Sequence, residues 1–237
     1  LAAAALASGR HVLVEKPVSL RGDEVERLAA IARTSERLCV PAMCMRHWPA
    51  WPWLRDRVRE GTYGEVRSAV FRRLGARPGW GNGFYADPLR CGGALFDLHI
   101  HDIDFIRWCF GPPDDTRSFG TRNHVTTALH YGAGPAHVIA EGGWSLAPSA
   151  GFRMNYMVCF EHATAEFDLA RSTPLVVHAA SGSTPVELSP HSAYELQLEA
   201  VVHALRSGDR SNVPTLDEAA AVTRLLERSA AMLDAGY

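Results

Sequence analysis

The sequence is poor in features that mark membrane, nucleic-acid-binding or secreted proteins. No apolar run approaches the ~20 residues of a membrane span. A formal net charge of −2 gives no sign of a nucleic-acid or membrane partner. The five cysteines are odd in number and contain no C-x-x-C pair, which argues against a disulfide framework and a structural zinc site. We expect buried free thiols in a reducing, cytoplasmic compartment.

What is present is an ordinary globular composition, 47% hydrophobic and 21% charged. A chain of 237 residues is long enough for one large domain or two small ones. There is no internal repeat and no low-complexity tract, so we expect a single set of packed helices and strands.

The first 48 residues have the order of a parallel α/β unit. We predict a helix end, a strand, a helix and a strand over residues 1–9, 11–14, 23–38 and 39–45. Gly9 suits the C-cap of the first helix. The chain opens inside that helix and without Met, so we expect that the earlier strands of the unit precede it in the whole protein.

The remainder alternates between helical and strand patterns. We predict helices over 49–60, 92–111, 193–207 and 215–235, and strands over 66–74, 116–121, 124–131, 136–144, 152–160, 164–169 and 174–180. The short, alternating strands indicate an open, mostly antiparallel sheet with helices on one face. The long loop 75–90 is rich in glycine, proline and aromatics, which is typical of functional loops. The fold class is therefore α/β plus α+β.

One segment, GGALFDLHIHDIDFIRWCFG (92–111), concentrates the chemistry. In an α-helix Asp97 and His101 are four residues apart and lie on one face, above an apolar stripe. This pattern is typical of an active-site wall. An ordinary Asp–His helical pair with surface charges is the alternative. In open α/β sheets ligands bind at the carboxyl ends of the strands, where Lys16 and Arg46 lie.

The motifs HVLVEKP, MRHWPAW, GEV and GGALFDLHIHDID, in this order, resemble the Gfo/Idh/MocA oxidoreductases, which include glucose–fructose oxidoreductase and inositol dehydrogenase. The resemblance implies that residues 1–48 are a C-terminal remnant of a Rossmann NAD(P)-binding domain. Residues 49–237 are then a domain for substrate binding and oligomerisation, and we expect its last helices to pack back on the Rossmann part. It also implies hydride transfer between NAD or NADP and a secondary alcohol of a sugar, inositol or related polyol.

Site residues follow from the resemblance by position. It implies catalytic roles for Lys16, Asp97 and His101, cofactor contacts for Glu15, Lys16, Pro17 and Arg46, and substrate contacts for Lys16, Trp80, Tyr85, Asp97 and His101. No metal is implied.

The chemistry agrees with these roles. An imidazole can take the alcohol proton near neutral pH, an ammonium can stabilise the developing alkoxide, and a carboxylate can fix a substrate hydroxyl.

Other readings of these residues stay open. Lys16 could be a solvated strand-end lysine, and Trp80 and Tyr85 could merely anchor the loop. His99 could contact substrate or lie on another face of the helix. Asp104 and Trp108 are more consistent with structural roles.

The sequence contains no G-x-G-x-x-G turn that follows a strand and opens a helix. Gly79, Gly81 and Gly83 lie in a loop and do not qualify. We therefore expect these 237 residues to bind NAD(P) poorly or to be unstable alone.

Two other functions compete with the oxidoreductase. One is a non-catalytic relative that acts in ligand binding or oligomerisation. The other is a metal hydrolase that uses His99, His101, Asp102 and Asp104, which helical geometry disfavours because these residues point in different directions. A homo-dimer or homo-tetramer through the sheet is expected, with a small polyol or sugar as substrate.

Overall fold

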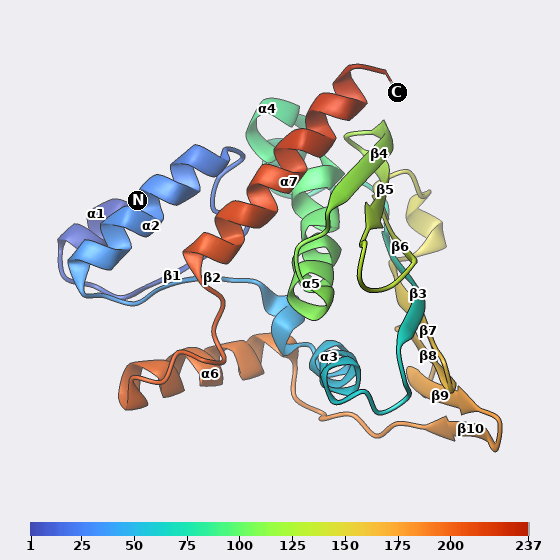
Figure 1. The fold of residues 1–237 in the computed structure, drawn as a ribbon. Coiled ribbons are helices and arrows are strands. Elements are labelled where there is room, and N and C mark those ends of the chain that lie inside the picture. Colours follow the sequence, from blue (N-terminus) through green and yellow to red (C-terminus); the bar gives the residue numbers. More distant parts are fainter. Residues whose placement is uncertain (237) are drawn as a thin grey trace.

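The computed structural model describes residues 1–236, which form a small parallel unit beside a large sheet with its helices (Figure 1). In the small unit, β1 (Val12–Val14) pairs in parallel with β2 (Cys39–Pro41). Helices α1 (Ala2–Ala7) and α2 (Gly22–Ser35) flank these strands. The helix predicted at the start of the chain is confirmed. The parallel pairing expected of the two strands in the first 48 residues is confirmed as well.

The large sheet has eight strands in the order β10-β9-β8-β7-β3-β6-β5-β4. The strands are β3 (Val66–Leu74), β4 (Asp115–Thr121), β5 (His124–His130), β6 (His137–Gly143), β7 (Arg153–Phe160), β8 (Ala163–Asp168), β9 (Leu175–Ala179) and β10 (Gly182–Pro185). Every neighbouring pair is antiparallel except β3 with β6, which run in parallel. The open, mostly antiparallel sheet is therefore confirmed, with β10 as a strand that the sequence did not predict.

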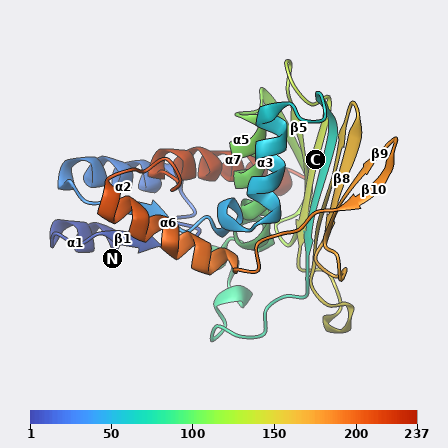
Figure 2. The same ribbon diagram turned by 90° about the horizontal axis from the view of Figure 1, so that it is seen from below.

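Helices cover one face of this sheet (Figure 2). They are α3 (Ala50–Glu60), α5 (Ile100–Phe110) and α7 (Leu216–Asp234), while α6 (Ala193–Ser207) lies beside the small unit. Helix α7 packs against both α2 and β4, so it links the two parts. Both C-terminal helices begin with capping boxes, Ser192 with Glu195 and Thr215 with Glu218, which satisfy the first free N–H groups.

The strand pattern explains which face is covered. In β7 alternate side chains, Met154, Tyr156, Val158 and Phe160, are buried beneath the helices. Trp51 of α3 is fully buried and meets the rings of Tyr156 and Phe167 edge-on, with centroid separations of 5.4 and 4.8 Å. Aromatic contacts of this geometry fix the helix on the sheet.

Three details differ from the sequence-based predictions. The strand predicted over 39–45 ends at Pro41 and is followed by a 3₁₀ turn, η1 (Cys44–His47). The helix predicted over 92–111 is a π-helical turn, η3 (Leu95–His99), joined to α5. All five cysteines are free, but Cys159 is only partly buried.

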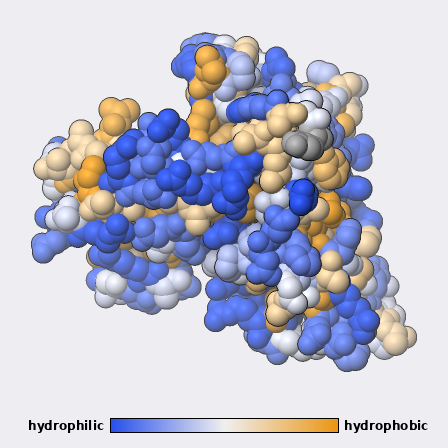
Figure 3. Space-filling view, turned by 45° about the horizontal axis from the view of Figure 1, so that its top comes forward, coloured by the Kyte–Doolittle hydropathy of each residue, from blue (hydrophilic) through white to orange (hydrophobic). Residues whose placement is uncertain are grey.

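The loop between β3 and α5 holds two short helical turns, η2 (Phe84–Ala86) and α4 (Pro88–Cys91), and another 3₁₀ turn, η4 (Pro148–Ala150), precedes β7. On the face shown in Figure 3 hydrophilic residues predominate, and hydrophobic residues form separate patches among them. Within residues 1–236, no helix is both long enough and apolar enough to cross a membrane.

Candidate active site

The carboxyl end of β1 meets the central helical segment through one ion pair. The Nζ atom of Lys16 donates to Oδ1 of Asp97 at 2.8 Å and to the carbonyl oxygen of the same residue at 2.7 Å. The two side chains are 16% and 17% exposed. The structure thus brings together two residues to which the resemblance gave catalytic roles, at a place that a solute can reach.

The π-helical turn presents Asp97 to this lysine. It follows Gly92 and Gly93, whose φ angles of 73° and 76° suit glycine. A Cβ atom on Gly93 would lie 2.6 Å from the carbonyl oxygen of Arg122, which accepts a bond from the N–H of Leu95. Only glycine permits this close approach. π-helical turns of this kind occur frequently at functional sites.

His101 lies one turn further along, with its Nδ1 atom 3.9 Å from the sulfur of Cys44. Burial lowers the pKa of His101 well below its ordinary value, and the positive charges of Lys16 and Arg73 lower it further. The imidazole is therefore neutral at neutral pH. A neutral ring has a free lone pair and can accept a proton.

Two further side chains, Cys44 beside His101 and Tyr194 beside Cys44, were not predicted. Cys44 follows the carboxyl end of β2, so it shares the sheet edge of Lys16, and that position was the signal that could have identified it. Tyr194 comes from the first turn of α6, and its pKa is raised first by the charge of Cys44, then by burial and by Glu15. No local pattern indicated this contact, since α6 lies far along the chain.

Tyr85 lies near Asp97 and is packed against other aromatic side chains. The ring of Tyr85 lies 4.7 Å from Trp80 and 5.7 Å from Trp144, both edge-on. Burial raises the pKa of Tyr85, followed by the negative charge of Asp97. Trp80 is 69% exposed, so its ring is free to meet a ligand while its edge rests on Tyr85.

The exposed Glu15 and the partly buried Pro17 flank Lys16 at the end of β1. Arg46, by contrast, is not brought to this edge. Its guanidinium donates to both oxygens of Asp104 at 2.7 and 2.9 Å and to Glu218 at 2.8 Å. The 3₁₀ turn that replaces the predicted strand directs Arg46 inward, so these contacts give no support to a cofactor role. They give Asp104 the structural role expected of it.

His99 lies on a different face of the segment. It is fully buried, and its Nε2 atom is 2.9 Å from Oγ1 of Thr127. A chain of hydroxyl groups continues from there through Ser118 to Ser229, at 2.8 and 2.9 Å. Burial lowers the pKa of His99 to about 3. This histidine fastens the π turn to the sheet and α7, which leaves it no contact with a substrate.

The positions of these side chains also argue against the alternative of a metal hydrolase. No three His, Cys, Asp or Glu side chains within residues 1–236 are grouped so as to hold a metal ion. The four candidate ligands have separate partners: His99 contacts Thr127, His101 contacts Cys44, Asp102 pairs with Arg73, and Asp104 pairs with Arg46.

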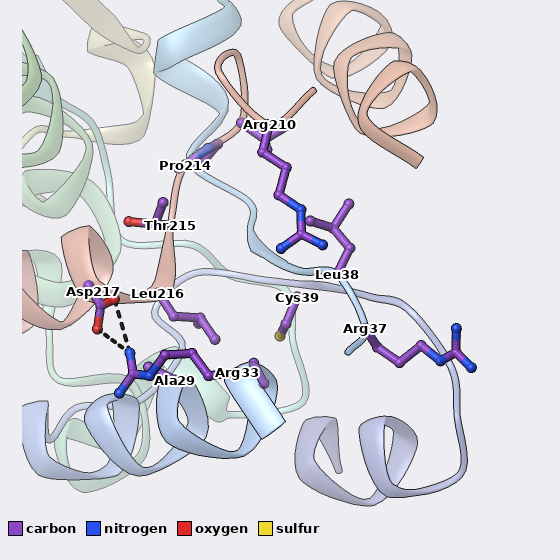
Figure 4. Close-up of a pocket in the computed structure, with 12 residues that line it drawn as sticks. Ala29, Arg33, Arg37, Leu38, Cys39, Arg210, Pro214, Thr215, Leu216 and Asp217 are labelled. Carbon is purple, nitrogen blue, oxygen red and sulfur yellow. Dashed lines mark hydrogen bonds and ion pairs between the residues drawn. The ribbon is translucent and has the colours of Figure 1, made fainter. Parts of the chain in front are cut away.

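A basic pocket of about 210 Å³ lies elsewhere, between the end of α2, the start of β2 and the loop before α7 (Figure 4). Arg33 is bonded there to Asp217, and Arg210 extends over Leu38. Leu38 and Cys39 precede and begin β2, whereas Lys16 follows the carboxyl end of the parallel strand β1. This pocket therefore opens at the opposite edge of the small sheet and is separate from the candidate active site.

The carboxyl edge of the small parallel unit carries a lysine, and the helical segment on the open sheet supplies an aspartate and a neutral histidine. Residues 51–173 match the family described as GFO/IDH/MocA C-terminal domain. The chain belongs to this family.

Known proteins agree with that assignment. The chain is 35% identical over 117 residues to the uncharacterized oxidoreductase sll0816 of Synechocystis. This alignment covers 47% of this chain and 31% of the relative. The chain is 32% identical over 139 residues to trans-1,2-dihydrobenzene-1,2-diol dehydrogenase of Macaca fuscata fuscata, covering 53% of this chain and 40% of the relative. These matches span well under half the length of the relatives.

Among solved structures, GenD2 from gentamicin A biosynthesis, in complex with NAD, superposes with a TM-score of 0.80 at 22% identity. The superposition covers 97% of this chain and 72% of the other. At this identity the likeness supports the fold.

Proposed function

We propose that this chain is the substrate-binding part, with the adjoining cofactor edge, of an NAD(P)-dependent oxidoreductase. The reaction transfers a hydride between the nicotinamide and a secondary alcohol of a sugar, inositol or related polyol. The observation that supports this most directly is the partly exposed contact between Lys16 and Asp97, which lies beside the neutral His101.

The residues present fit the nicotinamide end of a dinucleotide. Glu15, Lys16 and Pro17 lie just past the carboxyl end of β1, at the edge where α/β sheets bind such ligands. When bound, the nicotinamide would take up the hydride. The glycine-rich turn for the pyrophosphate is not found in these 237 residues.

The side chains divide the remaining work. Asp97 accepts a hydrogen bond from a substrate hydroxyl and holds the alcohol beside Lys16. The Nζ atom of Lys16 donates to the oxygen that becomes an alkoxide and stabilises its charge. His101 accepts the proton, since its lowered pKa keeps the ring neutral. Trp80 offers an exposed ring face to sugar C–H groups.

Nicotinamide fluorescence tests the proposal. NADH and NADPH are titrated into the 237-residue chain and into the protein encoded by its whole gene. We expect weak binding by the former, which lacks a glycine-rich turn, and micromolar binding by the latter. If neither binds, the non-catalytic alternative is favoured instead. Micromolar binding by the 237 residues alone would contradict the expectation of weak affinity.

We also propose that the sheet face without helices is a contact between copies of the chain (Figure 2). Met157 of β7 and Phe119 of β4 point outward there and are 47% and 51% exposed. Light scattering after size exclusion should give a dimer or tetramer. A single monomer peak would overturn this proposal.

A further inference from the structure

A second, largely apolar pocket lies next to the candidate active site. It has a volume of about 490 Å³. The side chains around it come from the start of α3, the ends of β8 and β9, and the segment that leads into α6; they include Trp48, Phe167, Leu169, Leu188, Ser189 and Tyr194. Its size and its apolar walls with few polar groups are those of small-molecule sites.

Tyr194 joins the pocket to the catalytic groups. Its ring lines the pocket and is 61% exposed. Helix α6, which carries it, packs against η1, the turn that holds Cys44. Cys44 in turn contacts the imidazole of His101. A molecule that occupies the pocket is therefore separated from the imidazole of His101 by the side chains of Tyr194 and Cys44.

The walls of the pocket are firmly held and apolar. Phe167 is 1% exposed and stacks on Tyr156, with ring centroids 5.4 Å apart. Leu169 is 39% exposed, and its backbone N–H is bonded to the carbonyl oxygen of Met154. A fixed aromatic floor with an accessible aliphatic rim favours a flat, apolar ring over a hydroxylated one, because hydroxyl groups would lose their water without gaining partners.

We propose that this pocket is a substrate subsite that takes an apolar, ring-bearing substituent attached to the alcohol. The preferred substrates are then glycosides or cyclic alcohols with an aromatic or alicyclic group, and free polyols bind more weakly. The inference rests on the proposed function, since it places the reacting hydroxyl at Lys16 and Asp97.

Matched glycosides test the subsite. Methyl and phenyl β-glycosides of glucose, galactose and mannose are titrated calorimetrically into the form of the protein that binds NADH, with the cofactor present. Burying a phenyl ring should make the phenyl member of the accepted pair bind roughly tenfold to hundredfold more tightly. Leu169→Glu should abolish this advantage and leave the methyl glycoside unchanged.

Two further variants test whether the effect of Leu169→Glu is specific to the pocket. Ser189→Trp fills the pocket without removing a core atom and should also abolish the advantage. Leu205→Glu places the same charge on a leucine of α6 that is 43% exposed and does not line the pocket, so it should change nothing.

The outcomes separate the subsite from the function. Equal affinity for the members of every pair, or an advantage that survives Leu169→Glu, would overturn the subsite alone. Phenyl binding that persists in Lys16→Ala would show a ring site independent of the catalytic groups, and would overturn it too. If no glycoside binds, the proposed substrate class fails and the subsite fails with it.

Discussion

Three ion pairs hold the central helical segment, and they are of two kinds. Arg73 with Asp102, and Arg46 with Asp104, are bidentate pairs whose side chains are 1–6% exposed. The Lys16–Asp97 pair has a single carboxylate contact and is 16% and 17% exposed. Two pairs are therefore sealed, and the third is open to solvent.

This difference in exposure and geometry distinguishes ion pairs that hold the fold from the ion pair proposed to take part in catalysis. A bidentate guanidinium fixes both the position and the plane of a carboxylate. The sealed pairs thereby set where α5 lies against β3 and η1. An ammonium is a compact charge with rotatable donors, so Lys16 can exchange a carboxylate for a substrate oxygen without moving the backbone. The following predictions test this division.

Breaking a sealed pair should have the largest effect. Burial raises the pKa of Asp102, and Arg73 opposes that rise. Arg73→Met leaves a buried carboxylate without its partner and should lower the free energy of unfolding by about 3–5 kcal/mol. Urea denaturation measures the loss. The double variant Arg73→Met/Asp102→Leu should recover much of it, and equal stabilities of single and double variants would contradict the argument.

Breaking the open pair should alter activity rather than stability. Lys16→Met removes the donor to the developing alkoxide and should lower kcat by about 10²–10³-fold. Its effect on unfolding should stay within about 1 kcal/mol, because Asp97 remains hydrated. Steady-state kinetics and urea denaturation on one preparation give both values. A large loss of stability would place Lys16 among the scaffold residues.

The fully buried His99 should make the stability of the protein depend on pH. Its pKa of about 3 in the folded chain lies below the ordinary value near 6.5. Between pH 6.5 and pH 3, His99 binds a proton in the unfolded chain but not in the folded chain. The free energy of unfolding therefore falls as the pH falls through this range. This residue should lower the free energy of unfolding at pH 5 by ~2 kcal/mol relative to its value at pH 7.5. In His99→Gln, where an amide can still bond Thr127, the decline between pH 7.5 and pH 5 should be shallower by that amount. Parallel curves for the two proteins would refute the assignment.

The smallest effect is expected at the rim of the open pair. Trp80→Ala removes an exposed ring that meets the ring of Tyr85 edge-on. KM should rise about threefold to tenfold, with kcat unchanged. Leu205→Ala, at a leucine of α6 that is 43% exposed and does not line the apolar pocket, serves as the control and should leave KM unaltered. An unchanged KM in Trp80→Ala would mean that this ring only anchors its loop.

Local patterns predicted much of this fold. Helix α3 ends at Glu60, as predicted for residues 49–60, and β7 lies within the strand predicted over 152–160. Strand β10 was missed because Gly182–Pro185 is exposed along its whole length and has little strand propensity. The family resemblance, and not a local pattern, assigned Lys16 and Asp97 to one site, and the structure brings their side chains into contact.

Contacts between distant segments account for the rest. The π turn depends on the approach of Gly93 to the carbonyl oxygen of Arg122, which no spacing within 92–111 encodes. The inward turn of Arg46 depends on Asp104 and Glu218 together. Tyr194 reaches Cys44 only because α6 folds back on η1.

The one parallel pairing in the large sheet bears on how the site forms. Strands β3 and β6 are neighbours, yet the loop with Trp80, the π turn, α5 and two further strands all lie between them in the chain. Closing so long a connection costs entropy before the pairing returns any energy. The helical segment that carries Asp97 and His101 therefore lies inside a long loop that closes slowly, and we expect competence for ligand binding to develop late in refolding, after the hairpins β4–β5 and β7–β8 have formed.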